Sequence, residues 1–185
     1  MPKARPHTVN GTAPRREARC SRVLPSLSGI VAAQELLAPY NCETPLTRSS
    51  ELSEFAADVW IKDETVSPIR CFKHRGALTE LIRVGRLSRV SAAVTSSTGN
   101  HGLAVAYAAK QLGLAAHIVL PAGASAIKKA GIPALGGTIH SLGADIDEAK
   151  AEARIFARQS GIAFVDDGES LGVIEGAGTI GLEIA

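Results

Sequence analysis

An alternation of short apolar runs with longer amphipathic segments, between residues 92 and 165, restricts the fold of this 185-residue chain more than any other feature. The apolar runs predict buried strands at Ala92–Thr95, Ala115–Leu120, Thr138–Leu142 and Ile162–Val165. The segments between them predict helices at Asn100–Leu112, Ala126–Leu135 and Asp145–Ser160. Strands and helices that alternate across turn-length connections form a parallel sheet with right-handed crossovers. The sequence therefore predicts an α/β fold.

The last of these helices carries the clearest local signals. Asp145 can cap its first turn and Gly161 can end it. One face is predicted to be apolar, formed by Ile146, Ala149, Ala153 and Phe156. Glu148 and Glu152 are predicted to face solvent.

The chain before residue 90 is less regular. It predicts a helix at Ile30–Ala38 that Pro39 closes, and a strand at Val59–Lys62. Thr44-Pro45-Leu46 predicts a loop or an edge segment, because a residue before proline is pushed towards extended geometry. A further helix is predicted at Lys73–Val84, since apolar residues recur there at helical spacing.

Composition narrows the class of protein. Hydrophobic residues make up 45% of the chain but aromatic residues only 4%, so small aliphatic side chains must fill the core. A net charge of +2 indicates no nucleic-acid partner, and no apolar run reaches the length of a membrane span. Cys20, Cys42 and Cys71 have no metal-ligand spacing, nor have the histidines. We therefore expect no metal site, and reduced thiols in a cytoplasmic protein.

The first residues are strongly basic. Residues 1–22 contain six lysines and arginines against a single acid, Glu17. We interpret residues 1–28 as a disordered basic tail, or as the result of a start codon assigned too far upstream. A transit peptide is the alternative, because such segments are rich in arginine and poor in acids. Scattered prolines and the lack of an amphipathic stripe argue against that alternative.

A lysine at a predicted helix start is the first candidate for chemistry. Lys73 follows Phe72 and stands close to Arg75 in the string Cys71-Phe72-Lys73-His74-Arg75-Gly76-Ala77. A nearby cation and partial burial both lower the pKa of an amine, and an amine must be neutral to attack a carbonyl. For this string taken alone, an ordinary solvated lysine is the better explanation.

The second candidate is the string Ser96-Ser97-Thr98-Gly99-Asn100-His101-Gly102. It lies where a predicted strand ends and a helix begins, which is where open α/β sheets bind ligands. The first turn of the helix offers unpaired N–H groups to an anion, and glycines allow close backbone approach. A polar helix cap explains part of the string, but a carboxylate or phosphate site explains all of it.

A glycine pattern near the end of the chain is weaker. Gly176-Ala177-Gly178-Thr179-Ile180-Gly181 matches the G-x-G-x-x-G pattern of dinucleotide-binding sites. A strand should precede that pattern and an acidic residue should follow about 20 residues later, and the sequence provides neither. We therefore give a dinucleotide-binding module little weight.

In this order and spacing the strings resemble the fold-type II pyridoxal phosphate (PLP) enzymes, the threonine dehydratase and serine racemase group, from about Thr44 to Ala185. The family's TPL, FKxRGA and asparagine-loop motifs are matched by Thr44-Pro45-Leu46, by Phe72 to Ala77 and by Ser97 to Gly102. Its IVMP, DEA and GQGTIGLE motifs are matched in part by Leu120-Pro121, Asp147-Glu148-Ala149 and Gly176 to Glu183. Such an ordered set is far more specific than any single motif.

The resemblance implies a role for each residue. Lys73 holds PLP as a Schiff base and then acts as the base at the Cα of the substrate, while Phe72 supports the cofactor. Asn100 hydrogen-bonds the ring hydroxyl of PLP. The substrate carboxylate is received by Ser97, Thr98, Gly99 and His101. The implied reaction removes water from a threonine- or serine-type hydroxy amino acid and releases ammonia and a 2-oxo acid.

The chain departs from the family pattern at several positions and in length. Cys71 stands where serine is usual, Arg70 where glycine is common, Ala177 in place of glutamine, and Glu175 in place of a small residue. Family members are about twice as long, with the phosphate loop and any metal site in the second half. The resemblance therefore implies the small lobe of a tryptophan synthase β-like fold with an incomplete large lobe.

This interpretation divides the chain into four parts. After the tail, residues 29–84 form the N-terminal part of the large PLP domain with the lysine helix, residues 85–170 the small α/β domain, and residues 171–185 the start of the rest of the large domain. Full-length relatives are expected to form homodimers or larger assemblies. The alternative to an active enzyme is an inactive remnant of one. Within the family, the alternatives are a racemase, or a dehydratase that acts on hydroxyaspartate or on a hydroxyectoine-derived substrate.

Overall fold

The sheet at the centre of the molecule is parallel, as predicted. The computed structural model describes residues 24–55, 58–124 and 126–185, so most of the predicted tail lies outside the described residues. Four strands pair in the order β5-β4-β3-β6, all parallel. Their bounds are β3 (Ala92–Ser96), β4 (Ala115–Leu120), β5 (Gly137–Ser141) and β6 (Ala163–Phe164). The predicted α/β class is therefore confirmed.

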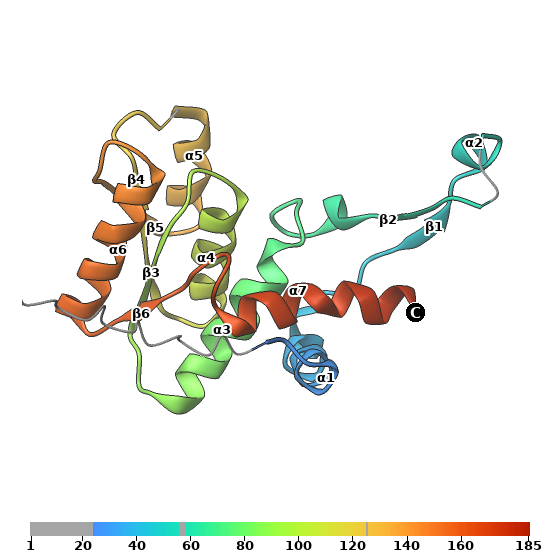
Figure 1. Ribbon diagram of the computed structural model, residues 1–185, viewed down its shortest axis with the longest axis horizontal. Coiled ribbons are helices and arrows are strands. Elements are labelled where there is room, and N and C mark those ends of the chain that lie inside the picture. Colours follow the sequence, from blue (N-terminus) through green and yellow to red (C-terminus); the bar gives the residue numbers. More distant parts are fainter. Residues whose placement is uncertain (1–23, 56–57, 125) are drawn as a thin grey trace, which may run out of the picture.

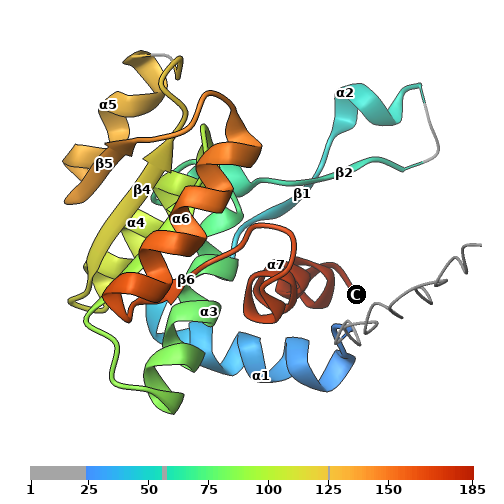
Figure 2. The same ribbon diagram turned by 60° about the vertical axis from the view of Figure 1, so that its left-hand side comes forward.

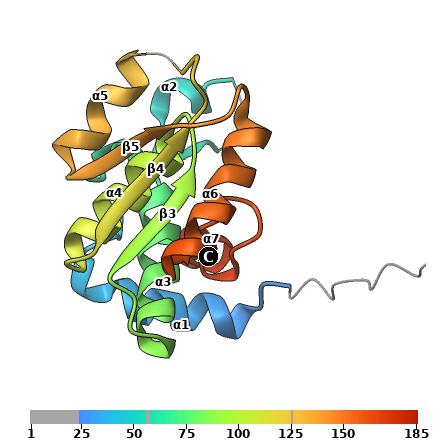
Figure 3. The ribbon, with the colours of Figure 1, turned by 90° about the vertical axis from the view of Figure 1, so that its left-hand side faces the viewer.

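Helices cover both faces of this sheet. Helices α4 (Asn100–Gln111) and α5 (Ala126–Ala134) lie on one face and α6 (Ile146–Ser160) on the other (Figure 3). Successive strand residues point to opposite faces, so Ala93 belongs to the core cluster under α4 while Val94 packs with the buried alanines of α6. Alanines without exposed surface on both helices let them lie close to the sheet, which explains how a core with few aromatic residues is filled.

Three further helices form a layer beside the sheet (Figure 2). They are α1 (Leu27–Leu37), α3 (Lys73–Leu87) and α7 (Leu171–Ile184). Helices α3 and α7 approach very closely: a Cβ atom on Gly76 would lie 2.5 Å from the carbonyl oxygen of Val173, and one on Gly176 would lie 2.6 Å from that of Arg75. The glycine pattern therefore lies inside α7, where Gly176 serves helix packing, and not at a turn between a strand and a helix, which contradicts the dinucleotide-binding alternative.

A two-stranded antiparallel ribbon extends away from these layers (Figure 1). Its strands are β1 (Leu46–Arg48) and β2 (Trp60–Lys62), and the short helix α2 (Ser50–Ser53) follows β1. Two turns of 3₁₀ helix, η1 (Ala38–Tyr40) and η2 (Glu64–Val66), complete the described elements. Trp60, Ile61 and Phe55 are all exposed on the ribbon.

The predicted boundaries differ from the observed ones mainly at helix ends. Helix α1 begins three residues before the predicted Ile30, because the hydroxyl of Ser26 caps it by accepting a hydrogen bond from Gly29 N–H. Helix α3 continues past the predicted end at Val84 to Leu87, since Gly85 is accommodated within the helix. Ile146, predicted on the apolar face of α6, is 43% exposed because it stands in the first turn, at the rim of a cavity. The division of the chain into domains stays a prediction.

Candidate active site

Lys73 begins helix α3 at a helix start that has no side-chain cap. Its side chain is 27% exposed, and its Nζ lies 2.5 Å from Oδ1 of Asp167 and 5.4 Å from the centre of the Phe72 ring. The next residue, His74, is buried and bonds the carbonyl oxygen of Cys71 through Nδ1. The amine of Lys73 is therefore accessible and is held by a carboxylate from another part of the chain.

The asparagine loop connects β3 to α4, as the sequence predicts. Ser97 Oγ accepts a hydrogen bond from Gly99 N–H, and Gly99, at the N-cap of α4, contributes no capping side chain. Asn100 is exposed at the first position of the helix and Thr98 is half-buried. A helix start with uncapped N–H groups, an exposed amide and nearby hydroxyls provides hydrogen-bond donors for an anion.

His101 points inward from the same loop. Its imidazole is buried, and Nε2 lies 3.4 Å from the carbonyl oxygen of Val165 at the end of β6. Burial lowers the pKa of His101, while the charge of Asp167 opposes that shift. Nδ1 of His101 lies 3.3 Å from Oδ1 of Asp167.

Asp167 therefore brings the two motifs together, since one of its oxygen atoms faces both Lys73 and His101. Sequence reasoning missed this residue. A signal was present, because Asp166-Asp167-Gly168 comes directly after the last predicted strand, at the edge where parallel sheets bind ligands.

The loop that carries Asp167 is anchored by its neighbour. Asp166 is buried, and its carboxylate pairs with Lys150 at 2.8 Å and with Arg154 at 2.9 Å. It also accepts a hydrogen bond from Gly168 N–H. Burial opposes the ionised form of Asp166, but the hydrogen bonds from Lys150, Gly168 and Arg154 outweigh it and lower its pKa.

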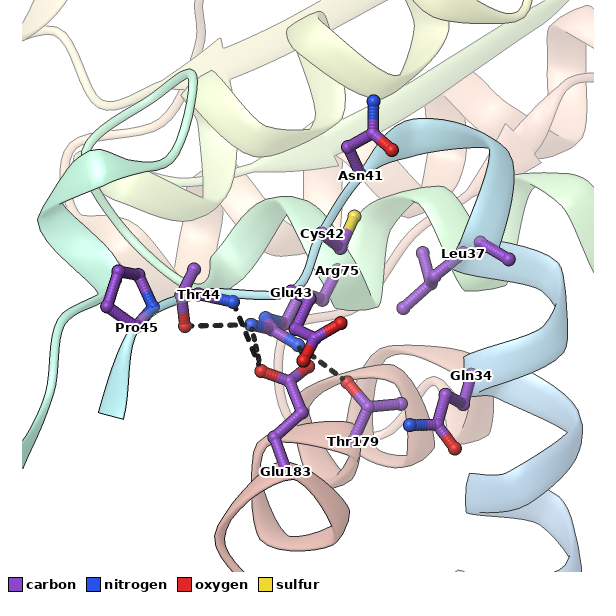
Figure 4. A pocket seen from close by; sticks show the side chains of 11 residues that line it. Gln34, Leu37, Asn41, Cys42, Glu43, Thr44, Pro45, Arg75, Thr179 and Glu183 are labelled. Atoms are coloured by element: carbon purple, nitrogen blue, oxygen red, sulfur yellow. Dashed lines mark hydrogen bonds and ion pairs between the residues drawn. The ribbon is translucent and has the colours of Figure 1, made fainter. Parts of the chain in front are cut away.

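A cavity of about 360 Å³ lies beside this loop, lined among others by Ser97, Thr98 and Asp167. A larger cavity of about 630 Å³ lies beside Arg75 (Figure 4). We assign the candidate site to Lys73 and the asparagine loop beside the smaller cavity, because Asp167, which lines that cavity with Ser97 and Thr98, contacts the amine. The larger cavity adjoins a charge cluster whose hydrogen bonds are already satisfied within the chain.

Arg75 does not face Lys73, contrary to the sequence-based expectation, but pairs with Glu64 and Glu183. Residues two apart on a helix point in different directions, and the fully buried guanidinium of Arg75 points towards α7 (Figure 4). It donates to Glu64 at 2.9 Å and to both carboxylate oxygens of Glu183. It also donates to the hydroxyls of Thr44 and Thr179. Arg75 thus joins α3 to α7 and to the segment before β1.

Two of the departures from the family pattern have a visible structural basis. Arg70 has a φ of 56°, in the left-handed region that favours glycine, which accounts for the glycine common in the family. The carboxylate of Glu175 is buried but paired with Arg83 at 2.5 Å, and it accepts a hydrogen bond from Ser26 N–H. Glu175 therefore joins α7 to α3 and to the start of α1.

Residues 37–185 match the family model described as pyridoxal-phosphate dependent enzyme. The chain belongs to this family. Among curated members it is 36% identical to the biosynthetic L-threonine dehydratase IlvA of Haemophilus influenzae over 142 residues, covering 76% of this chain and 28% of that enzyme. It is 31% identical to the serine racemase of Schizosaccharomyces pombe over 163 residues, covering 88% of this chain and 50% of the racemase.

Solved structures of family members agree with the fold. Maize serine racemase matches with a TM-score of 0.81 and 31% identity, over 86% of this chain and 49% of that structure. The processed form of threonine deaminase isoform 2 from Solanum lycopersicum matches with a TM-score of 0.76 and 32% identity, over 86% of this chain and 46% of that structure. This family member thus spans about half the length of the matched structures. No helix among the residues described is long and apolar enough to cross a membrane.

The residues at the site fit the cofactor of the family. Lys73 offers a reachable amine, and the asparagine loop offers an exposed amide, hydroxyls and a helix start without a side-chain cap. Around Gly99 there is open space, with no heavy atom within 4 Å of a Cβ atom placed there. These groups suit a planar, anionic aldehyde that becomes attached to an amine.

Proposed function

We propose that this chain is the N-terminal part of a PLP-dependent amino-acid ammonia-lyase. The reaction removes water from a threonine- or serine-type hydroxy amino acid and yields a 2-oxo acid and ammonia. The observation that carries the proposal is the meeting of Lys73 and His101, from two separate motifs, at one oxygen atom of Asp167. When bound, PLP supplies an electron sink for the charge that develops at the substrate Cα.

Each site residue then has a specific task. Lys73 holds the cofactor covalently and later carries the proton to and from the substrate Cα. Phe72 supports the cofactor, and Asn100 donates a hydrogen bond to its ring hydroxyl. The substrate carboxylate is bound by Ser97, Thr98, Gly99 and His101, supported by the uncapped start of α4.

The similarity to a serine racemase supports a second candidate, a racemase that uses the same lysine and loop. Dehydratases of hydroxyaspartate or of hydroxyectoine-derived substrates have the same sequence in the asparagine loop. A catalytically inactive remnant of such an enzyme is the alternative that is not an enzyme. Incubation with L-serine separates the first two, because a racemase yields D-serine while a dehydratase yields pyruvate.

Cofactor binding is tested first. The 185-residue chain is incubated with PLP, reduced with borohydride and digested, and the labelled lysine is located by mass spectrometry. We expect label on Lys73 and a visible absorption band that Lys73→Ala abolishes. Lys110→Ala, at an exposed position near the end of α4, is the matched control and should retain both. Equal labelling of the Lys73→Ala and wild-type chains would contradict the proposal.

Activity is tested separately by following 2-oxobutanoate from L-threonine. We expect low or no activity from these 185 residues, because about half of the family structure is absent from them. Robust turnover would contradict that expectation but not the proposed reaction.

The proposed partners are a small amino acid and, in the full-length enzyme, a second copy of the chain. We also propose a cytoplasmic location. It agrees with the free thiols of Cys42 and Cys71 among the described residues, and burial raises the pKa of Cys42 to about 11. Redox titration of both thiols in cell extract tests this part.

A further inference from the structure

The two nitrogen atoms of the His101 ring have different surroundings. Nε2 faces the carbonyl oxygen of Val165, which can only accept a hydrogen bond, so Nε2 must carry a hydrogen atom to bond it. In a neutral imidazole Nδ1 then has only a lone pair. Consistent with this, the buried Nδ1 has no hydrogen-bond partner within the described residues.

The carboxylate of Asp167 lies beside that unpartnered nitrogen. Its Oδ1 lies 3.3 Å from Nδ1 but 2.5 Å from the Nζ of Lys73, with which it forms the shorter contact. A carboxylate can bond Nδ1 only if that nitrogen also carries a hydrogen atom, which requires the charged imidazolium. Protonation of His101 and pairing of Lys73 therefore compete for the same oxygen atom.

We propose that Asp167 is a positioning residue that exchanges partners: it holds the ammonium of Lys73 in the cofactor-free chain, and it holds a protonated His101 once Lys73 is engaged by the cofactor. The proton comes from solvent, or from Lys73 when its ammonium becomes a neutral amine. The exchange places a positive charge in the loop that binds the substrate carboxylate, at the stage when substrate is needed. The second half of this inference rests on the proposed function.

The surroundings of Asp167 suit such an exchange. Its neighbour Asp166 is fixed by Lys150 and Arg154, so the loop is expected to stay in place when Lys73 leaves. Asp167 itself is about half-exposed, which leaves its carboxylate room to turn.

The charges that act on His101 have the required signs. Burial lowers its pKa, Asp167 and the hydrogen bond to Val165 raise it, Lys73 lowers it, and Asp166 raises it. Removal of the lysine charge should therefore favour the imidazolium, whereas removal of the Asp167 charge should disfavour it.

The test is an NMR titration of the His101 ring in the PLP-free chain, with resonances assigned by standard triple-resonance experiments. Lys73→Met should raise the proton affinity of His101 about three-fold, and Asp167→Asn should lower it by a similar factor. Glu169→Gln is the matched control: it lies in the same loop but pairs with Arg154, and it should leave His101 unchanged. Shifts in the same direction for both variants, or no shift in either, would overturn the proposal.

A second arm adds PLP to the wild-type chain and locates it by borohydride trapping. Attachment at Lys73 should raise the proton affinity of His101 as Lys73→Met does, and attachment without that change would refute the exchange. Failure of PLP to attach would count against the proposed function, and the partner exchange would then be judged by the PLP-free variants alone.

Discussion

Replacement of Arg75 by methionine removes a fully buried charge that connects α3 with α7 and with the segment before β1 (Figure 4). Removal of one member of a buried ion pair costs about 3–5 kcal/mol, because the partner charge is left buried and unpaired. Glu64 loses its cation, but Glu183 keeps Lys62 at 2.5 Å and the N–H of Thr44. We therefore expect the lower end of the range, about 3 kcal/mol.

Urea unfolding at pH 7, followed by circular dichroism, measures this loss. Arg48→Met is the control, because Arg48 and Asp58 form an exposed pair whose removal should cost less than about 1 kcal/mol. If Arg75→Met does not fold, Glu64→Gln tests the same cluster more gently, since it removes one charge and keeps the shape. A loss below about 1 kcal/mol for Arg75→Met would refute the view that this cluster holds α3 and α7 together.

The pH dependence of the same variant gives an independent check. Burial opposes ionisation of Glu183, but the hydrogen bonds from Arg75 and Lys62 outweigh it and lower its pKa. A carboxylate with a lowered pKa stabilises the fold above its unfolded pKa and loses that contribution as the pH falls through the folded value. Arg75→Met should therefore flatten the stability profile on the acid side, and an unchanged acid slope would contradict this account.

Close helix packing, backbone strain and buried histidines each affect the stability of the chain measurably. Gly176→Ala should lower the free energy of unfolding by about 2–3 kcal/mol, because its Cβ atom would meet the backbone of Arg75. Gly181→Ala, in open space on the same helix, should raise it by up to about 1 kcal/mol. Equal effects of the two substitutions in thermal unfolding would contradict this. Arg70→Gly should stabilise the chain by about 0.5–1 kcal/mol by relieving a positive φ, and a loss of stability in urea would argue against that strain. Burial lowers the pKa of both His74 and His101 in the folded chain. The free energy of unfolding measured in urea should therefore fall as the pH drops through about 6.5, the pKa of histidine in the unfolded chain. A free energy of unfolding that stays constant from about pH 8 to about pH 5.5 would exclude this.

Patterns that depend on neighbouring residues predicted the fold well. The apolar run Ala115–Leu120 is strand β4 without a boundary error. Asp145 caps α6 as predicted, accepting hydrogen bonds from the N–H groups of Asp147 and Glu148. The start of α1 was predicted three residues late, at Ile30 instead of Leu27, whereas the start of α3 at Lys73 was predicted correctly.

The electrostatic arrangement of the site could not be predicted in the same way. The heptapeptide around Lys73 placed Arg75 beside the amine, yet the partner that directs Arg75 away is Glu183, 108 residues later. Likewise the carboxylate that holds Lys73 is 94 residues away in sequence. Spacing along the chain contains no information on such pairs, because they depend on which helices and loops meet in three dimensions.

The motifs on which the family resemblance rests are thus brought together in space by a residue that belongs to none of them. Lys73 begins α3 and Asn100 begins α4, so each motif sits at a helix start. The amine nevertheless reaches the asparagine loop through Asp167, a residue outside every matched motif. A chain with all the motifs but asparagine at position 167 would resemble the family just as closely, and its lysine would lack the carboxylate that holds it beside His101. Motif matching therefore identifies the class of chemistry, whereas the position of the Lys73 amine depends on Asp167 and has to be tested by substitution of that residue.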